Sequence, residues 1–218
     1  MEQEKEKFRR AVYLPVVFVF IIWVIEIVET NLGLSFVRLG VYPQQTKGLA
    51  GIITAPFIHG DYLHLLSNTF SLLMLAVGVG YFYPNSSRKV YVVIWLVTGF
   101  MVWLWARPSY HIGASGLIYG MVAFLFFSGA IRKDLRASVL ALIVVFFYGS
   151  LIWGVLPIKD GVSWESHLFG GISGIIAAIL FRKQDPYERK YSWEDEEDDD
   201  DDDTPPNKLE INWDNVQR

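Results

Sequence analysis

Two side chains of this sequence are suited to covalent chemistry, a serine between two glycines and a histidine in another apolar run. Ser115 lies in GASG, residues 113–116, and His167 lies in SHLFGG. A serine hydroxyl becomes a nucleophile when a nearby histidine takes its proton. Gly113 and Gly116 leave room for a substrate carbonyl, and a helix start here favours developing negative charge. The pair therefore predicts acyl transfer.

A second polar pair lies in an earlier apolar run. His64 and Asn68 in HLLSN are four residues apart and share one helix face, with His59 shortly before them. Histidine and asparagine side chains are suitable donors to an oxyanion. One buried histidine alone would be explained as a hydrogen-bonding group between helices. A His–Asn pair at the depth of Ser115 and His167 favours an acyl-transfer site.

Other chemistries fit the sequence less well. The chain has no cysteine, which excludes a thiolate nucleophile, a thiolate ligand and a disulfide. It lacks an H-E-x-x-H run, paired aspartates within its apolar runs, and the phosphate loop G-x-x-x-x-G-K-[ST]. His59 and His64, five apart, would lie on different helix faces. We expect no metal, no cofactor and no nucleic-acid partner.

The apolar residues, 52% of 218, come in blocks long enough to cross a bilayer. Six candidate spans cover residues 11–28, 63–83, 90–106, 113–131, 137–154 and 164–181. Because lipid offers no partner to backbone groups, each span must be helical. The first run is longer than the apolar part of a signal peptide and lacks a small-residue cleavage site, so we interpret it as an uncleaved helix. The predicted fold is an all-α membrane protein with a six-helix bundle.

These spans place the polar residues in one layer near one membrane surface. A helix that begins near residue 112 puts Ser115 about 5 Å below its edge and Tyr119 one turn deeper. His167 lies in the first turns of the last span. Small residues repeat at helical spacing on both spans: Gly116 and Gly120 on one, and Gly170, Gly171 and Gly174 on the other. Such faces let two helices pack closely, with Ser115 facing His167. A packing seam without chemistry is the alternative, although it does not call for a histidine.

The basic residues are distributed asymmetrically between the loops. If the N-terminus is cytoplasmic, the outer side holds only Arg38, Lys47, Arg107 and Lys159. Six spans then put both termini in the cytoplasm and the polar layer near the outer side, and we expect a cell membrane, plasma or inner. The first outer loop, residues 29–62, mixes glycine, proline and apolar residues. We expect it to lie in the membrane interface with short helical pieces.

In these motifs the sequence resembles the rhomboid family of intramembrane serine proteases, over about residues 10–182. The family's G-x-S-G is GASG, and its tyrosine four residues after the serine is Tyr119. Its His-x-x-x-Asn is HLLSN, preceded at the expected distance by His59. Its histidine before a glycine-rich sixth helix is His167. Four motifs in the right order, each on the right span, make the resemblance specific.

The resemblance implies a role for each of these residues. Ser115 and His167 would form a dyad without a carboxylate. His64, Asn68 and the Ser115 backbone N–H would form the oxyanion hole. The expected activity is hydrolysis of peptide bonds in or next to transmembrane segments of substrate proteins, through an acyl-enzyme.

Three supporting roles are also implied. Tyr119 would hold the His167 ring, Gly113 would leave space for substrate, and Gly170 would let the serine helix pack closely. The acidic residues near His167 in sequence, Asp160 and Glu165, are interpreted as solvated loop charges.

The sequence departs from the family in its first outer loop. Many members carry a Trp-Arg pair there, whereas residues 29–62 contain no tryptophan and only Arg38 as arginine. Other contacts must therefore hold this loop.

Two other functions are weighed against the protease. A non-catalytic relative would bind transmembrane helices as an adaptor, but such relatives usually lack one member of the dyad. A channel or transporter would use the polar layer as a pathway, but the first three spans do not resemble the last three.

The composition changes after residue 183. Residues 184–218 are charged, and 194–203 are ten consecutive acids. We expect a membrane domain over 1–183 and a disordered acidic cytoplasmic tail over 184–218. The acids are also compatible with a basic partner or weak divalent-ion binding. A short docking segment would include Leu209, Ile211, Trp213 and Val216. The sequence leaves the substrate and the oligomeric state open.

Overall fold

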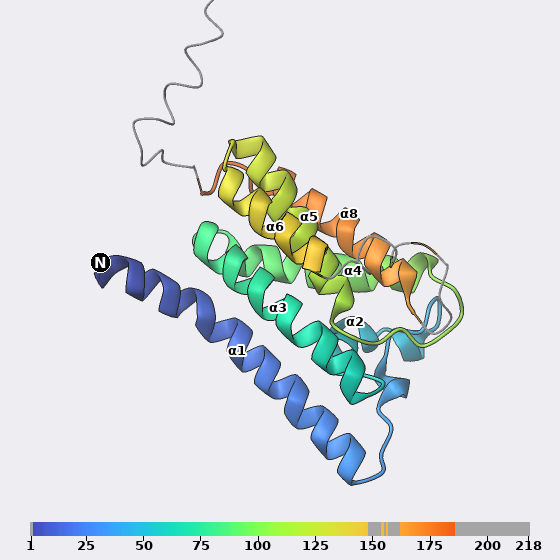
Figure 1. Cartoon of the computed structure of the whole chain (residues 1–218). Helices are drawn as coiled ribbons and strands as arrows, with labels where there is room; N and C mark the ends of the chain where they lie inside the picture. The colour runs from blue at the N-terminus through green and yellow to red at the C-terminus, as the bar shows by residue number, and fades with distance from the viewer. Residues whose placement is uncertain (1, 148–153, 155, 157–161, 186–218) are drawn as a thin grey trace, which may run out of the picture. The chain divides into compact units, whose positions relative to one another are not determined.

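The computed structural model describes residues 2–147, 154, 156 and 162–185 (Figure 1). Its longer helices are α1 (Glu2–Asn31), α3 (Tyr62–Phe82), α4 (Ser87–Trp105), α5 (Ser115–Arg132), α6 (Leu135–Phe147) and α8 (Trp164–Leu180). Between α1 and α3 lie η1 (Val37–Leu39), η2 (Thr46–Gly48), α2 (Gly51–Thr54) and η3 (Ala55–Phe57). The prediction of short helical pieces in this loop is confirmed. Asp160 and nearly all of the predicted tail lie outside the described residues.

The all-helical prediction is confirmed for the described part of the chain. Four helices, α1, α3, α4 and α5, are long and apolar enough to cross a membrane, whereas α6 and α8 are apolar but shorter. The helix α1 begins nine residues before the predicted span, at Glu2. Its polar first turns are stabilised by ion pairs from Glu6 to Arg9, at 2.7 Å, and to Arg10, at 2.9 Å. Its 30 residues measure about 45 Å, more than the hydrocarbon thickness of about 30 Å.

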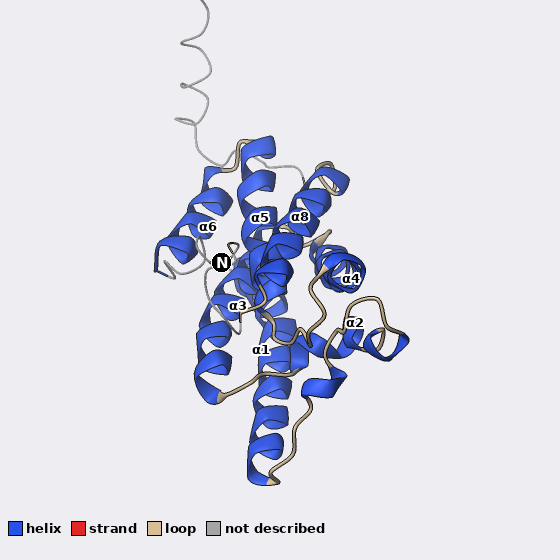
Figure 2. Ribbon diagram, turned by 90° about the vertical axis from the view of Figure 1, so that its right-hand side faces the viewer, coloured by secondary structure: helices blue, strands red, loops and turns tan. Residues whose placement is uncertain are grey.

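The helix α5 lies at the centre of the bundle (Figure 2). It packs against α8, α6, α3 and α4, while α1 packs on α3 at the edge. Its Leu117, Phe124 and Leu125 belong to the main apolar core, together with Leu75 of α3 and Ala177 of α8. Neighbours on four sides fix the position of α5, and therefore of its first residue, Ser115.

The start of α5 differs from the prediction. A helix from residue 112 was expected, but α5 begins at Ser115 with Ala114 as its N-cap. The reason is Gly113, whose φ of +101° is incompatible with a right-handed helix. Ser115 is therefore the first helical residue, and its N–H has no carbonyl of its own helix to bind.

Two tryptophans of α4 hold the loop between α1 and α3. The Trp95 indole donates to the Ile52 carbonyl and the Trp103 indole donates to the Gln45 carbonyl, each at 3.0 Å. Val41 also exchanges two backbone hydrogen bonds of 2.9 Å with His111. These contacts show how the loop is held without a tryptophan of its own.

At the opposite end of the bundle, a buried aspartate connects α8 to the turn before α4. Asp185 accepts hydrogen bonds from the backbone N–H groups of Asn85, at 2.7 Å, and Ser86, at 3.0 Å, and from the Ser86 hydroxyl, at 2.5 Å. Arg132 donates to the carbonyls of Asp185 and Phe181. These bonds fix the C-terminal end of α8.

Candidate active site

Ser115 and His167 lie within hydrogen-bonding distance of each other. Ser115 opens α5 and His167 lies in the first turn of α8. The Ser115 Oγ is 2.9 Å from the His167 Nε2, and the histidine side chain is buried. The structure therefore brings together the two residues that the sequence paired as nucleophile and base.

The remaining contacts of the His167 ring fix its tautomer. Its Nδ1 lies 2.7 Å from the Gly154 carbonyl, which can only accept a hydrogen bond. Nδ1 therefore carries the hydrogen, and the lone pair of Nε2 faces the Ser115 hydroxyl. The Tyr119 ring stacks on the imidazole with centroids 4.2 Å apart and planes 10° apart. A base held in this tautomer can take the serine proton.

Glycines allow α5 and α8 to approach closely enough for this bond. A Cβ added at Gly170 would overlap the Gly116 carbonyl oxygen, and one at Gly174 would overlap the Gly120 carbonyl oxygen. In contrast, a Cβ at Gly171 would meet nothing within 4 Å. The contact face of α8 thus uses two of the three glycines singled out in its sequence, and Gly171 lies off it.

His64 and Asn68 lie beside the backbone that leads into Ser115. Asp61 caps α3 by accepting the His64 N–H at 2.7 Å, which fixes the turn that carries His64. A Cβ at Gly113 would be 2.9 Å from His64 Cε1 and 3.8 Å from Asn68 Nδ2. Asn68 is buried, and its Nδ2 has no hydrogen-bond partner within the described part of the chain. Two side-chain donors therefore flank the space in front of Gly113.

His59 lies behind this pair rather than in it. It follows η3 in the loop before α3, is buried, and its ring contacts the His64 ring edge-on with centroids 5.1 Å apart. Burial, together with the neighbouring His64, lowers the pKa of His59 to about 4. His59 is therefore a neutral support for His64.

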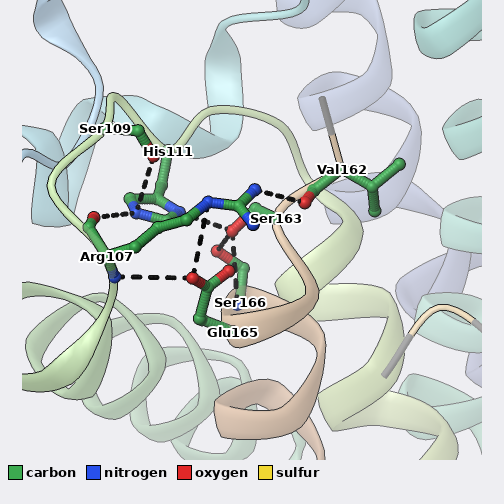
Figure 3. Close-up of polar contacts among 7 residues, drawn as sticks. All are labelled: Arg107, Ser109, His111, Val162, Ser163, Glu165 and Ser166. Carbon is green, nitrogen blue, oxygen red and sulfur yellow. Dashed lines mark hydrogen bonds and ion pairs between the residues drawn. The ribbon is translucent and has the colours of Figure 1, made fainter. Parts of the chain in front are cut away.

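The interpretation of Glu165 as a solvated charge is wrong. Its side chain is 3% exposed, and its Oε1 lies 3.6 Å from Arg107 Nε and 3.4 Å from the Arg107 backbone N (Figure 3). The loop after α4 passes over the first turn of α8, which brings Arg107 onto Glu165. The guanidinium also donates to the Val162 carbonyl at 2.6 Å. Glu165 lies two residues before His167 in the chain, so Arg107 contacts the first turn of the helix that carries His167.

Sequence reasoning gave no role to three further residues near the dyad. The contact of the Gly154 carbonyl with His167 could not be predicted from the sequence, because every residue has a backbone carbonyl. His111 and Ser163 did have one, since each lies four residues before a member of the dyad. Among the described residues, no three His, Asp or Glu side chains group as metal ligands do.

Comparison with known proteins identifies the family of the chain. A family model for the Rhomboid domain matches residues 46–184, so the chain belongs to the rhomboid family. With its apolar helices, it is an integral membrane protein. An uncharacterized protein of Mycobacterium tuberculosis is 36% identical over 174 residues, which cover 75% of this chain and 72% of that protein.

Two further relatives are more distant. An uncharacterized protein of Mycobacterium leprae is 34% identical, over 75% of this chain and 68% of its own length. A protein of Acanthamoeba polyphaga mimivirus with "rhomboid" in its name is 26% identical, over 57% of this chain and 71% of its own length.

Proposed function

We propose that the protein is an intramembrane serine protease that hydrolyses peptide bonds in or next to transmembrane segments of membrane proteins. The observation that carries the proposal is the 2.9 Å contact between Ser115 Oγ and His167 Nε2, with Nδ1 occupied by the Gly154 carbonyl. A serine beside a correctly oriented neutral imidazole is the arrangement that nucleophilic catalysis requires. Membership of the rhomboid family supports the same reading.

The proposed reaction has two halves. Ser115 Oγ attacks the scissile carbonyl while His167 Nε2 takes its proton. The imidazolium then gives this proton to the leaving amine, which produces the acyl-enzyme. In the second half, His167 activates a water that releases the acid and restores Ser115. A neutral carbonyl on Nδ1 and the Tyr119 ring orient the base in place of a carboxylate.

We further propose that His64, Asn68 and the Ser115 N–H stabilise the oxyanion. The two side chains flank the space at Gly113, and the N–H opens α5, where the helix dipole favours negative charge. Loss of one such donor costs about 10²–10³ in kcat in soluble enzymes. The positive φ of Gly113 supports a role for this residue in leaving space for the substrate backbone.

In the proposed membrane arrangement α1, α3, α4, α5, α6 and α8 all cross the bilayer. Both termini are cytoplasmic and the site opens to the outer side of the cell membrane, which the distribution of basic residues supports. A substrate helix has its carbonyls bonded to N–H groups four residues on, so it must unwind before attack. We expect substrates with glycine, proline or small residues near the cut.

Cleavage of a single-span reporter by the purified protein in liposomes tests the proposal. Wild type is compared with Ser115→Ala, His167→Ala and the matched control Ser67→Ala, an exposed serine of α3. We expect cleavage to be lost in the first two variants and kept in the third. An activated phosphonate should label Ser115 in wild type and in Ser67→Ala, but should not label Ser115→Ala or His167→Ala.

Each alternative has its own outcome. Cleavage that survives Ser115→Ala would refute the dyad. Absence of both cleavage and labelling in a folded wild type would favour the adaptor. A protein truncated after residue 186, which keeps Asp185 and its bonds to Asn85 and Ser86, should retain its cleavage activity, because we place the protease in the membrane domain.

A further inference from the structure

His111 is fixed in a polar cluster that joins the loop before Ser115 to the start of α8 (Figure 3). The residue is buried, with 3% of it exposed, and both ring nitrogens have partners. Nε2 lies 3.0 Å from the Arg107 carbonyl, and Nδ1 lies 2.6 Å from the Ser163 Oγ. Ser109 Oγ is a more distant neighbour of Nε2, at 3.3 Å.

These contacts define the tautomer of His111. The Arg107 carbonyl can only accept, so Nε2 carries the hydrogen. In a neutral ring Nδ1 is then an acceptor, and the Ser163 hydroxyl donates to it. Burial lowers the pKa of His111, and the nearby Arg107 guanidinium lowers it further, while the Arg107 carbonyl and Glu165 raise it. The neutral ring is thus the form expected near pH 7.

Ser163 is the N-cap of the helix that carries the candidate base. Its Oγ accepts the Ser166 N–H at 3.3 Å and lies 2.6 Å from the Ser166 Oγ. Its carbonyl accepts the His167 N–H at 3.4 Å. Because His111 takes the hydroxyl hydrogen of Ser163, the lone pairs of that hydroxyl point at the first turn of α8. The orientation of that turn therefore depends on the His111–Ser163 bond.

Backbone hydrogen bonds also fix His111 and the residues that lead from it to Ser115. It exchanges two 2.9 Å hydrogen bonds with Val41, and two residues later the Gly113 N–H donates to the Ala55 carbonyl at 2.9 Å. Ser115 follows after two more residues. His111 thus connects the hydrogen-bonded segment before Ser115 with Ser163, the N-cap of the helix that carries His167.

We infer that His111 is a positioning residue of the dyad, which fixes the Ser163-capped turn of α8 so that His167 meets Ser115. The inference rests on the proposed function. His111 touches neither member of the dyad through its side chain, so it acts on their alignment and not on the chemistry. An error of about 1 Å in such an alignment lowers the rate by up to about 10²-fold.

Two isosteric substitutions separate the two bonds of the ring. In His111→Asn the amide oxygen takes the place of Nδ1 and can still accept from Ser163. In His111→Gln the amide nitrogen takes the place of Nε2, keeps the Arg107 bond and loses the Ser163 bond. Ser163→Ala removes the same bond from the other side, together with the contacts of the Ser163 hydroxyl with Ser166. Ser109→Ala is the matched control, since it removes only the distant neighbour of Nε2.

The experiment measures kcat and KM for reporter cleavage in liposomes, with the apparent Tm of each variant as a folding control. We expect His111→Gln and Ser163→Ala to lower kcat at least about tenfold with KM within twofold. His111→Asn should stay within threefold of wild type, and Ser109→Ala within twofold. The His111→Gln, Ser163→Ala double variant should be no slower than Ser163→Ala alone, because Ser163→Ala already removes the bond that His111→Gln removes.

The outcomes separate this inference from the proposed function. Equal kcat values for His111→Asn and His111→Gln, or a wild-type kcat in Ser163→Ala, would overturn the positioning role while leaving the protease intact. If His111→Gln fails to fold, Ser163→Ala alone decides. A wild type that cleaves no faster than Ser115→Ala would overturn the proposed function and this inference with it.

Discussion

Two adjacent glycines of α8, Gly170 and Gly171, test how closely α5 and α8 must pack. Gly170 lies against α5, whereas Gly171 has open space beside it. In Gly170→Ala the new methyl group would overlap the Gly116 carbonyl oxygen and lie 3.0 Å from the Gly116 carbonyl carbon. An ordinary contact needs about 3.5 Å, so α8 must move away from α5 by about 1 Å. Overpacking of this kind costs about 1–3 kcal/mol, and a displacement of this size at the dyad lowers kcat by up to about 10²-fold.

Gly171→Ala is the matched control, because a Cβ there would meet nothing within 4 Å. It gains the helix propensity of alanine, up to about 1 kcal/mol, without the overlap. The assay compares kcat for reporter cleavage, phosphonate labelling and apparent Tm for the two variants side by side. Gly170→Ala should be slower and less stable, and Gly171→Ala should match wild type or exceed its Tm. Equal rates and equal Tm values in the two variants would refute the argument that this close packing sets the distance between Ser115 and His167.

Three further predictions concern other parts of the structure. Tyr119→Phe keeps the ring stacked on His167 and should stay within threefold of the wild-type kcat, whereas Tyr119→Ala should lose about threefold to tenfold, the equivalent of about 0.5–1.5 kcal/mol for an aromatic pair. The pKa of His59 is about 4 in the folded protein and 6.5 in the unfolded chain, so the unfolded chain takes up the proton first as the pH falls. The contribution of His59 to the free energy of unfolding is complete above pH 6.5, and about 2 kcal/mol of it is lost by pH 5. This loss should appear as a drop in apparent Tm between these pH values, and the drop should be smaller in His59→Gln. Asp185→Asn weakens bonds to Ser86 and its neighbour and should lower stability by about 1–3 kcal/mol with little effect on kcat; a large loss of kcat at an unchanged Tm would contradict the purely structural role.

Much of the helix pattern and the site could be predicted from the sequence, because both depend on strong local signals. Apolar runs of membrane length leave the backbone no alternative to a helix. The spacing of Ser115 and Tyr119, and of His64 and Asn68, is a helical spacing that survives small errors in the helix bounds. The start of α5 was wrong by three residues because Gly113 was read for its small size and not for its positive φ.

The polar cluster around α8 could not be predicted in this way. Arg107 and Glu165 are 58 residues apart, and nothing local in either segment indicates that they meet. A charge at the end of an apolar span is usually solvated, which favoured the wrong interpretation of Glu165. His111 was visible in the stretch before GASG, but its role depends on Ser163, 52 residues later. Contacts of this kind follow from tertiary packing, not from spacing.

The position of Glu165 also explains why the proposed base, His167, is oriented without a carboxylate. Glu165 lies two residues before His167 on α8, and residues two apart point to nearly opposite sides of a helix. Its Oε1 faces Arg107 in the loop after α4, so the carboxylate nearest to His167 in sequence interacts with this loop and not with the imidazole. The His167 Nδ1–H is left to the Gly154 carbonyl, which fixes the tautomer but bears no full charge. Such a base gains less stabilisation of its imidazolium than it would from a carboxylate. In the proposed mechanism its efficiency depends on geometry, which the glycines between α5 and α8, the Tyr119 ring and the Ser163 cap of α8 together provide.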